Sequence, residues 1–546
     1  MRNRLEDLDP EQDLVVIGGG INGAGVARDA ALRGFRVTLL EKDDFGAGAS
    51  SKTSKLAHGG LRYLEHGALR LVWEACHERR RLLRVAPHLV RPLPFVFPVY
   101  ADSRIPPWKL RAGMWLYDVL AAFRNVRPHR MLRTGEVDGA GAALRGEGLR
   151  AAALYYDAWM DDARLVLANV IGAREAGACT LNDAAVRRLL VREGRVCGVE
   201  FLDRLHGAAA ELYAPVVVAC TGAWTNALLA EIPGAPRPVA PTRGTHILVP
   251  RLADCAFTLA AGRDGRLFFV LPWLGMTLVG TTDEPDDDDP DRTAPTEAEV
   301  EYLLAEANRF FPAARLRRAD VIAAFAGLRP LKSGPGEGAA RRREHAVLEP
   351  VPGFLCVVGG KYTTYRAVAE QVVDQVEQRL GRRRSCRTQA AALPGGDVPW
   401  GAREQWEEGA AFRAAATRAA AAAGVDVETA MHLLRVHGAR AERILALVAS
   451  EPRLGIRLCP HLPHVRAEVV FAIRDEMALH ADDWYLRRSR MGYQPCHGAE
   501  ALNAIVDLFA AELRWNADTR AREVERARRA LDTAALTGSP TSSRSG

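Results

Sequence analysis

The chain has 546 residues, of which 48% are hydrophobic and 26% are charged, and its formal net charge at pH 7 is +6. This composition is ordinary for a globular protein with a sizeable core. The charge is modest for the length, so it does not indicate nucleic acid as a partner, and it suits an anionic small substrate or contact with an anionic membrane surface.

The nine cysteines are spread along the whole chain and none forms a CxxC pair. An odd number without paired spacing is typical of free thiols in a reducing cytoplasm, and no zinc spacing is present. Residues 1–13 lack the apolar segment of a secretory signal, and no run of 18 apolar residues occurs. We therefore expect a cytoplasmic protein without a metal, whose contact with a membrane is at most peripheral.

The first predicted elements form a βαβ unit that begins at residue 13. "DLVVI" predicts a buried strand, "VARDAALRG" a helix and "FRVTLLEK" a second strand. Between the first strand and the helix lie Gly18, Gly20 and Gly23, in GxGxxG spacing. Gly18 permits a tight turn, Gly20 lets the backbone meet a pyrophosphate, and Gly23 lets helix and strand pack closely. The helix N-terminus, which includes Asn22, offers amide groups to the same anion.

The second predicted strand ends at Glu41, about twenty residues after the glycine motif, where an acid binds the ribose hydroxyls. Such an acid favours FAD or NAD over NADP. The segment that follows, "FGAGASSKTSK", contains small hydroxyl residues and two lysines, and it suits a second contact with phosphate. Further glycine turns end apolar strands at Thr221-Gly222 and at Gly359-Gly360-Lys361. Several separated segments that hold one long dinucleotide favour FAD.

The rest of the chain alternates between predicted helices and strands up to about residue 390. Helices are predicted at 70–90, 108–122, 161–178, 296–312 and after residue 361. The proline-interrupted stretch 91–100 predicts an edge strand or a loop. "DEPDDDDPD", which starts at Asp283, lacks the glycine and the closing glutamate of a calcium loop, so we expect a solvated acidic loop. Pro- and Gly-rich sequence near 390 indicates a domain boundary.

Seven motifs in order carry a resemblance to a known family: "VVIGGGINGAG", "SSKTSKLAHGGLRYLEHG", "YYDAWMDDARLVLANV", "TRGTHILVP", "GTTD", "FAGLRPL" and "GGKYTTYR". Together they resemble the FAD-dependent glycerol-3-phosphate dehydrogenases. The resemblance is dense from residue 13 to about 380, and "EMALHADDWYLRRSRMGY" extends it more weakly into the C-terminal region. It implies hydride transfer from C2 of sn-glycerol 3-phosphate to N5 of a tightly bound FAD, with dihydroxyacetone phosphate as product. It also implies that a membrane quinone accepts the electrons, at the inner face of the cell membrane.

The expected fold is α/β: a discontinuous Rossmann-like FAD-binding domain, an inserted, mainly antiparallel β substrate domain, and an all-α C-terminal domain. Within the catalytic unit 1–390, we assign about 10–85, 150–240 and 345–385 to the FAD-binding domain. We assign about 86–149 and 241–344 to the substrate domain. Residues 391–530 form the helical domain, and the composition of 531–546 is that of a disordered tail.

Oxidation of a phosphorylated alcohol needs a clamp for the phosphate and a base for the hydroxyl proton. Arginine forks match phosphate, which makes Arg62, Arg329 and Arg343 the candidates for the clamp. Histidine suits the base, and His246, at the start of an apolar strand where the family's substrate contacts fall, is preferred over His58. The predicted catalytic residues are His246, Arg329 and Lys361. The predicted substrate-binding residues are Arg62, Tyr63, His246, Arg329, Arg343 and Lys361.

The predicted cofactor-binding residues come from all the glycine turns and from the segment after Glu41. They are Gly18, Gly20, Asn22, Gly23, Glu41, Ser50, Ser51, Thr53, Ser54, Lys55, His58, Gly59, Gly60, Thr221, Gly222, Gly359, Gly360, Lys361 and Thr363. In this interpretation "SKLAHGGLRYLEHG" connects two ligands. His58 and the pair Gly59-Gly60 pass close to the flavin ring, whereas Arg62 and Tyr63 face the substrate. A positive charge at Lys361 would stabilise the reduced flavin or touch the substrate.

Two other functions remain open at this point. A glycerol-3-phosphate oxidase would share the flavin site and pass electrons to oxygen, and a non-enzymatic flavin-binding sensor would need the cofactor site alone. The basic C-terminal helices could lie on an anionic membrane, although the acids interleaved with them favour a solvated face. A homodimer is compatible with the sequence.

Overall fold

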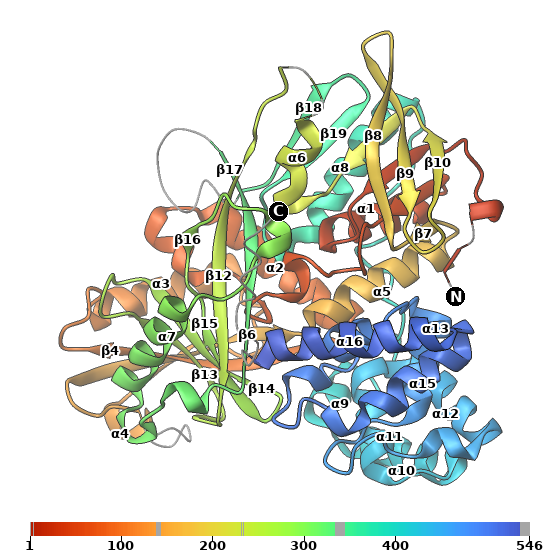
Figure 1. The fold of residues 1–546 in the computed structure, drawn as a ribbon. Helices are drawn as coiled ribbons and strands as arrows, with labels where there is room; N and C mark the ends of the chain where they lie inside the picture. The colour runs from red at the N-terminus through yellow and green to blue at the C-terminus, as the bar shows by residue number, and fades with distance from the viewer. Residues whose placement is uncertain are drawn as a thin grey trace, which may run out of the picture.

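The structure is a computed structural model that describes residues 2–3, 5–137, 144–230, 232, 234–333 and 344–535. Figure 1 shows three parts: an α/β layer at the upper right, a large β-sheet at the left, and a group of helices below the α/β layer. The α/β layer and the large sheet are each built from segments far apart in the chain, as we expected.

The α/β layer is a six-stranded sheet in the order β18-β19-β11-β1-β2-β7. Its strands are β1 (Leu14–Ile17), β2 (Val37–Leu40), β7 (Cys179–Leu181), β11 (Val216–Ala219), β18 (Ala346–Val351) and β19 (Phe354–Val358). All neighbours pair in parallel except β18 and β19. Parallel neighbours that are distant in sequence need crossover connections, which here carry the helices and the inserted strands.

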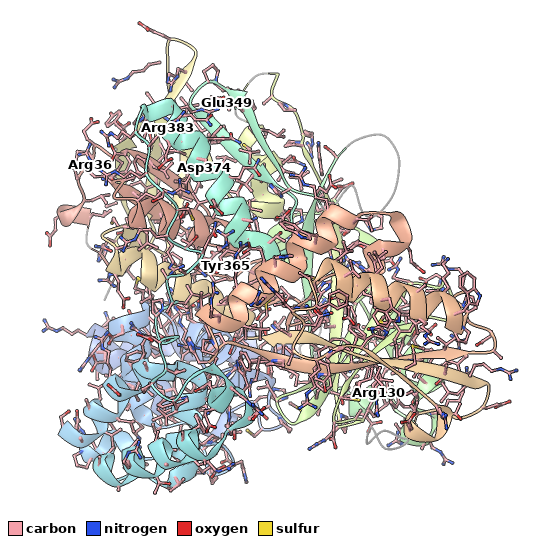
Figure 2. The ribbon with its side chains drawn as sticks, turned by 180° about the vertical axis from the view of Figure 1, so that it is seen from behind. Arg36, Arg130, Glu349, Tyr365, Asp374 and Arg383 are labelled. Carbon is pink, nitrogen blue, oxygen red and sulfur yellow. The ribbon has the colours of Figure 1, made fainter. Side chains whose placement is uncertain are left out.

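Both faces of this sheet are covered, which explains why its strands are apolar throughout. Leu14 and Val16 face a core shared with α1 (Ile21–Leu32), α5 (Asp162–Glu175) and α8 (Tyr365–Leu380). Val15 and Ile17 face the opposite core, which a three-stranded sheet covers. The strands of that small sheet are β8 (Ala184–Arg192), β9 (Arg195–Asp203) and β10 (Ala208–Tyr213). Figure 2, seen from behind, shows α8 running along the layer from Tyr365 to Asp374.

The large sheet has ten strands, and its central path runs β16-β12-β15-β14-β13-β4-β6-β3, with β17 paired to β12 and β5 to β6. The strands are β3 (Leu56–Ala57), β4 (Val90–Tyr100), β5 (Arg130–Leu132), β6 (Leu149–Met160), β12 (Val239–Val249), β13 (Ala256–Ala260), β14 (Leu267–Trp273), β15 (Met276–Gly280), β16 (Glu284–Pro285) and β17 (Ala323–Lys332). It is antiparallel except between β13 and β4. Five helices accompany these sheets: α2 (Leu69–Val85), α3 (Pro107–Leu120), α4 (Thr134–Val137), α6 (Thr225–Leu229) and α7 (Glu297–Phe310).

One domain boundary and the position of one strand differ from the sequence prediction. β6 pairs with β4 along its whole length, so residues 150–160 belong to the large sheet and not to the α/β layer. β4 itself is an interior strand, although its three prolines predicted an edge strand or a loop. Pro92, Pro94 and Pro98 occupy positions of the same parity, so the missing N–H groups all point to one side of the strand. Only two residue pairs join β4 to β13. The side of β4 that lacks N–H donors can therefore face β13 without losing many hydrogen bonds.

The C-terminal region is helical, as predicted. Its helices are α9 (Ala402–Glu407), α10 (Ala410–Ala423), α11 (Val427–His437), α12 (Ala441–Ser450), α13 (Arg466–Glu476), α14 (Ala481–Asp483), α15 (Leu502–Leu513) and α16 (Ala517–Ala535). The predicted disordered tail is wrong for residues 531–535, because α16 continues through them and buries Leu531 and Ala534. The rest of that tail lies outside the described residues.

Buried ion pairs connect the helical region to the α/β layer. The guanidinium of Arg488 donates to Asp44, which lies just beyond β2, with one bond of 2.8 Å, and Arg487 pairs with the same carboxylate. Arg164 on α5 donates to both carboxylate oxygens of Glu476 at 3.1 and 2.6 Å. Breaking such a pair would leave a charge uncompensated in the interior, so the two parts are held in one arrangement.

Candidate functional site

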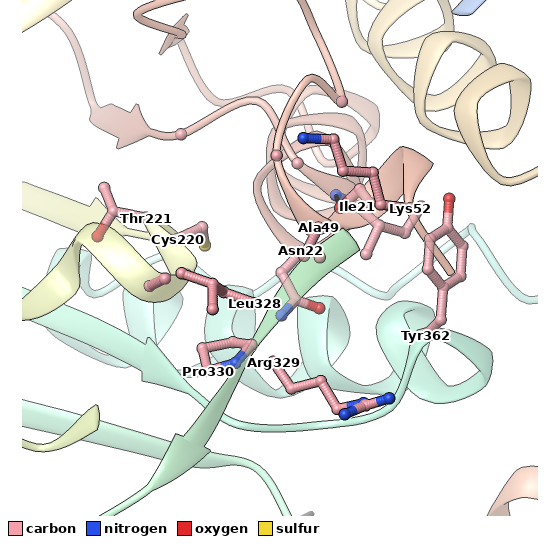
Figure 3. Close-up of a pocket in the computed structure, with 18 of the residues that line it drawn as sticks. Ile21, Asn22, Ala49, Lys52, Cys220, Thr221, Leu328, Arg329, Pro330 and Tyr362 are labelled. Carbon is pink, nitrogen blue, oxygen red and sulfur yellow. Dashed lines mark hydrogen bonds between the residues drawn. The ribbon is translucent and has the colours of Figure 1, made fainter. Parts of the chain in front are cut away.

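A cavity of about 540 Å³ lies between the α/β layer and the large sheet. Figure 3 shows Asn22, Thr221 and Arg329, which come from three separate parts of the chain, around this cavity. The predicted site residues that line it are Gly18, Gly20, Asn22, Glu41, Ser50, Thr53, Ser54, His58, Arg62, Tyr63, Thr221, Gly222, His246, Arg329, Gly359, Gly360 and Lys361. The fold thus brings most of the predicted residues to one place. Arg343 lies outside the described residues.

The glycine turn at one end of the cavity leaves its backbone bare. Gly18 has a φ of +99°, and a Cβ on Gly23 would lie 1.9 Å from the carbonyl oxygen of Gly18. Gly23 therefore acts in packing, behind the cavity wall, as the motif predicts. Gly20 caps α1 without a side-chain hydrogen bond of its own, and the Ile21 N–H donates to Ser50 Oγ at 3.0 Å. A bare turn at a helix N-terminus fits the pyrophosphate of a dinucleotide.

Glu41 stands at the cavity beside this turn. Its carboxylate accepts hydrogen bonds from the backbone N–H groups of Gly19 at 2.6 Å and of Asp43 at 2.9 Å. Burial raises the pKa of Glu41 to about 7. The two amides orient the carboxylate toward the space next to the glycine turn, where the ribose of a dinucleotide would need an acceptor.

Lys55 does not line the cavity, contrary to our prediction. Its ammonium lies 2.9 Å from both carboxylate oxygens of Asp162 and donates to the carbonyl of Ser51 at 2.6 Å, so it is engaged in a buried ion pair. Ser51 is also absent from the lining. Lys52 contributes to the wall instead. The predicted run of hydroxyl and lysine side chains therefore divides: Ser50, Lys52, Thr53 and Ser54 line the cavity, whereas Ser51 and Lys55 do not.

The pair Gly59-Gly60 serves packing and turn geometry, and neither residue lines the cavity. A Cβ on Gly59 would lie 2.3 Å from the Tyr117 hydroxyl oxygen. Gly60 has a φ of +81°, which favours glycine at the start of the 3₁₀ turn Leu61–His66. Thr363 also lies behind the wall, where its hydroxyl bonds the backbone of His58 at 3.1 and 3.2 Å. Gly59, Gly60 and Thr363 are predicted cofactor contacts, but in the structure they hold His58 and the following turn in place.

Part of the cavity wall is cationic. Lys361 lies with its ammonium 3.6 Å from the centroid of the Tyr63 ring, and Arg62 packs on the same ring at 5.1 Å. The buried Lys361 Nζ has no hydrogen-bond partner among the described residues. Burial and the nearby charge of Arg62 lower the pKa of Lys361 to about 7. An ammonium without an acceptor, next to a second cation, is an environment that suits an anion.

Arg329 is the third cation of this group and lies within β17. Its guanidinium donates to Thr281 Oγ1 at 2.7 Å, to the Thr282 carbonyl at 3.0 Å and to Asp283 at 3.1 Å. Burial lowers the pKa of Arg329, and the charge of Arg62 contributes to the shift, which indicates that the two guanidiniums are near each other. The group of Arg62, Arg329 and Lys361 is called the cationic group below.

His246 lies on β12 at the same cavity. Its Nε2 lies 2.8 Å from Ser54 Oγ, its ring stacks on Phe325 at 5.1 Å between centroids, and its buried Nδ1 has no partner within the part of the chain that the structure describes. Burial, with the charge of Arg329, holds the pKa of His246 well below its usual value. The imidazole is therefore neutral near pH 7 and can accept a proton.

Sequence reasoning overlooked two aspartates that hold this site together. Asp157 accepts from the Gly59 N–H at 2.9 Å and from the Tyr117 hydroxyl at 2.8 Å, and Asp162 binds Lys55. Both belong to "YYDAWMDDARLVLANV", one of the motifs that carried the resemblance. An acid within an otherwise aromatic and apolar strand was the signal that could have identified Asp157.

Comparison with known families matches nearly the whole chain. The family model described as "FAD dependent oxidoreductase" matches residues 13–375, and the model of the "C-terminal domain of alpha-glycerophosphate oxidase" matches residues 386–520. The first model ends at residue 375 and the second begins at residue 386.

Curated relatives match over similar lengths. The glycerol-3-phosphate dehydrogenase of Synechocystis sp. is 37% identical over 96% of this chain and 97% of its own. Glycerol-3-phosphate dehydrogenase 2 of Mycobacterium tuberculosis is 36% identical over 95% and 88%. Among solved structures, the glycerol-3-phosphate dehydrogenase from Bacillus halodurans complexed with FAD has a TM-score of 0.80 and 28% identity, with 96% of each chain covered. Glycine oxidase from Geobacillus kaustophilus, 21% identical with a TM-score of 0.53, shares the fold over 70% of this chain.

Proposed function

The chain belongs to the FAD-dependent oxidoreductases and, within them, to the glycerol-3-phosphate dehydrogenase family, and from this premise we propose that it oxidises sn-glycerol 3-phosphate to dihydroxyacetone phosphate and passes the electrons to a membrane quinone. One observation carries the choice of substrate: the cationic group and the bare glycine turn line the same cavity. One cavity thus has room for a dinucleotide and a place for a small phosphorylated substrate.

The residues at the cavity fit FAD. The turn at Gly18 and Gly20 would hold the pyrophosphate, Glu41 would accept from the ribose, and the turns at 221–222 and 359–360 would bound the rest of the cofactor. When bound, FAD supplies an acceptor for the two electrons and the hydrogen that leave C2 of the substrate.

The cationic group would hold the substrate phosphate. Arginine forks match the oxygens of a phosphate dianion, and the ammonium of Lys361 adds a point charge that has no competing acceptor among the described side chains. Because the three cations come from different elements, the phosphate would be fixed from several sides and the carbinol end of the substrate would be oriented.

His246 is our choice for the base that takes the hydroxyl proton. The bond to Ser54 orients its ring, and its low pKa keeps it neutral. His58 is the alternative, since it also lines the cavity and burial likewise lowers its pKa well below the usual value. In stopped-flow reduction, His246→Gln should slow the step by about 10²-fold or more, whereas His58→Gln should slow it less. The reverse order would move the role to His58.

Anaerobic titration of the purified yellow protein tests the proposed activity. We expect sn-glycerol 3-phosphate to bleach the flavin absorption and glycerol or a free amino acid to leave it unchanged. Reoxidation by a short-chain quinone that outpaces reoxidation by oxygen supports the dehydrogenase, whereas rapid formation of hydrogen peroxide would identify an oxidase. A flavin spectrum that glycerol 3-phosphate does not alter would exclude both enzymes and favour a non-enzymatic flavin-binding sensor.

The pKa of Lys361 predicts a pH dependence of substrate binding. Because that pKa lies near 7, the ammonium is charged below pH 7 and loses its proton above it, while the substrate remains a dianion. We therefore expect the KM for glycerol 3-phosphate to rise from pH 7 to pH 9. In Lys361→Arg, whose guanidinium stays charged, the KM should stay flat over this range. Parallel profiles in the two proteins would show that another group titrates.

An exposed apolar surface on and around α3 supports the membrane part of the proposal. Trp108 is 70% exposed, Phe123 65%, Trp115 54% and Val119 51%. Seven basic residues lie within 104–133, and the one acid in that range, Asp118, is buried beside His129. Exposed aromatic side chains among basic ones suit the interface of an anionic bilayer. None of the helices in the described ranges combines the length and apolar content that a membrane span requires.

Sedimentation with vesicles tests this surface. Wild type should pellet with vesicles that contain phosphatidylserine. The double variant Trp108→Asn/Trp115→Asn should bind at least about 10-fold more weakly, because it lacks the two exposed indoles that would insert into the bilayer interface. Ile456→Asn, which removes an exposed apolar side chain from the helical region, is the matched control. Equal binding of the double variant and the control would exclude α3 as the docking surface.

A further inference from the structure

The helical region contains a second group of side chains suited to bind a ligand, separate from the cavity. His432 lies on α11, His464 lies two residues before α13, and Glu468 lies in the first turn of α13. All three are buried, with 6%, 5% and 4% of their surfaces exposed. One ligating atom from each lies within 4.8 Å of the others. None of them lines the cavity of the proposed active site.

The distances from the two histidines to the carboxylate are close to those between ligands of one small metal ion. His432 Nε2 lies 2.9 Å from Glu468 Oε1, and His464 Nδ1 lies 3.2 Å from each oxygen of that carboxylate. With metal–ligand bonds of about 2.0–2.2 Å in tetrahedral geometry, ligand atoms lie roughly 3.3–3.5 Å apart. The nitrogen–oxygen distances thus lie within a few tenths of an ångström of those in such a site, and the two histidines each offer a ligand atom within 4.8 Å of the other.

A third histidine faces the same carboxylate but is not available as a ligand. Arg164 donates from Nη2 to His437 Nδ1 at 3.1 Å, which leaves the proton of the neutral ring on Nε2. That N–H points at Glu468 Oε1 from 3.6 Å, and the Val465 N–H donates to Oε2 at 2.9 Å. These groups orient the carboxylate from outside, which is the role that outer hydrogen bonds have around metal ligands.

We propose that His432 Nε2, His464 Nδ1 and Glu468 bind one divalent first-row transition ion, with Zn²⁺ as the best fit, and that the ion ties α11 to α13. Two imidazoles and a carboxylate suit Zn²⁺, whereas Mg²⁺ and Ca²⁺ prefer oxygen ligands alone. This replaces our expectation of no metal. Residues 432 and 464 are too far apart in sequence for a motif, and only the packing of the two helices brings them together.

The role of such an ion would be structural, because its ligands are buried and none of them lines the cavity of the proposed active site. α11 ends at His437, which meets Arg164 of the α/β layer, so an ion that fixes α11 would also stabilise the contact between the two parts. The alternative is a cluster of hydrogen bonds in which protons take the place of the ion. The two possibilities differ in a quantity that can be measured directly, the zinc content.

Zinc binding to the full-length, FAD-loaded protein decides between them. After treatment with a chelator, wild type should take up one equivalent of Zn²⁺ per chain in competition with a chromophoric chelator, and millimolar Mg²⁺ should not displace it. His432→Gln and His464→Gln should each weaken binding by about 10-fold or more, since even outer partners of metal ligands contribute that much. His480→Gln is the matched control, because His480 also faces a carboxylate, that of Glu523 at 2.9 Å, and should keep full binding.

Wild type that takes up no zinc, or ligand variants that bind as tightly as the control, would overturn the proposal. If the ligand variants do not fold, Co²⁺ added to wild type gives the answer. The difference spectrum against the cobalt-free protein should then contain the intense visible bands of four-coordinate Co²⁺, and weak bands of six-coordinate Co²⁺ alone would contradict the site.

Discussion

Gly23→Ala should yield a folded protein that contains less than about a tenth of the wild-type FAD. A Cβ at this position would lie 1.9 Å from the carbonyl oxygen of Gly18, and the atom it meets belongs to the backbone, which cannot rotate away. The turn at Gly18 and the start of α1 must then separate, at a cost of 1–3 kcal/mol or more. This displaces the amide groups that would face the pyrophosphate. The measurement is the ratio of flavin to protein absorbance after gel filtration.

Gly113→Ala is the matched control for this prediction. Gly113 is also a helical glycine, on α3, and a Cβ there would meet no atom within 4 Å. The same chemical change should therefore leave the FAD content at the wild-type level. A far-ultraviolet spectrum unchanged in both variants would show that any loss of FAD is local. Full FAD content in Gly23→Ala would mean that the cofactor does not depend on this turn.

Arg329→Ala should lower kcat/KM for glycerol 3-phosphate by about 10²- to 10³-fold. Loss of one partner of a buried, hydrogen-bonded charge pair costs about 2–5 kcal/mol, and every 1.4 kcal/mol corresponds to tenfold. The defect should appear mainly in KM if the guanidinium holds the phosphate equally in the ground and transition states. Steady-state kinetics with a quinone acceptor provides both constants.

Arg266→Ala controls for a general loss of positive charge. Arg266 is close enough to influence the pKa of Arg329, but it does not line the cavity and its own partners, Asp264 and Glu284, lie at 3.7 and 3.8 Å. Its removal should change kcat/KM by less than threefold, a bound set by the small energies of exposed ion pairs. Equal kinetics of Arg329→Ala and wild type would remove Arg329 from the phosphate site.

Much of the fold was predictable because it is recorded in local patterns. The glycine spacing after β1, the acid at the end of β2 and the helical periods of α2, α3, α5, α7 and α8 all depend on residues close together in the chain. The order of the motifs identified the family, the FAD cofactor and the helical C-terminal domain, and the comparisons confirmed all three. The assignment of individual site residues stays a prediction.

The tertiary structure alone decided which side chains of a motif face the site. Lys52 and Lys55 are equivalent in sequence, yet Asp162, from more than a hundred residues further along, holds Lys55 away from the cavity. A side chain at Gly59 would collide with the Tyr117 hydroxyl. His432 contacts Glu468 only because the tertiary fold brings α11 and α13 together. Local sequence determines backbone shape and period, whereas a side chain's partner depends on which distant segments pack against it. For this reason the sequence alone identified the motifs and the chemistry they suit. The packing decided which residues of those motifs could take part in that chemistry.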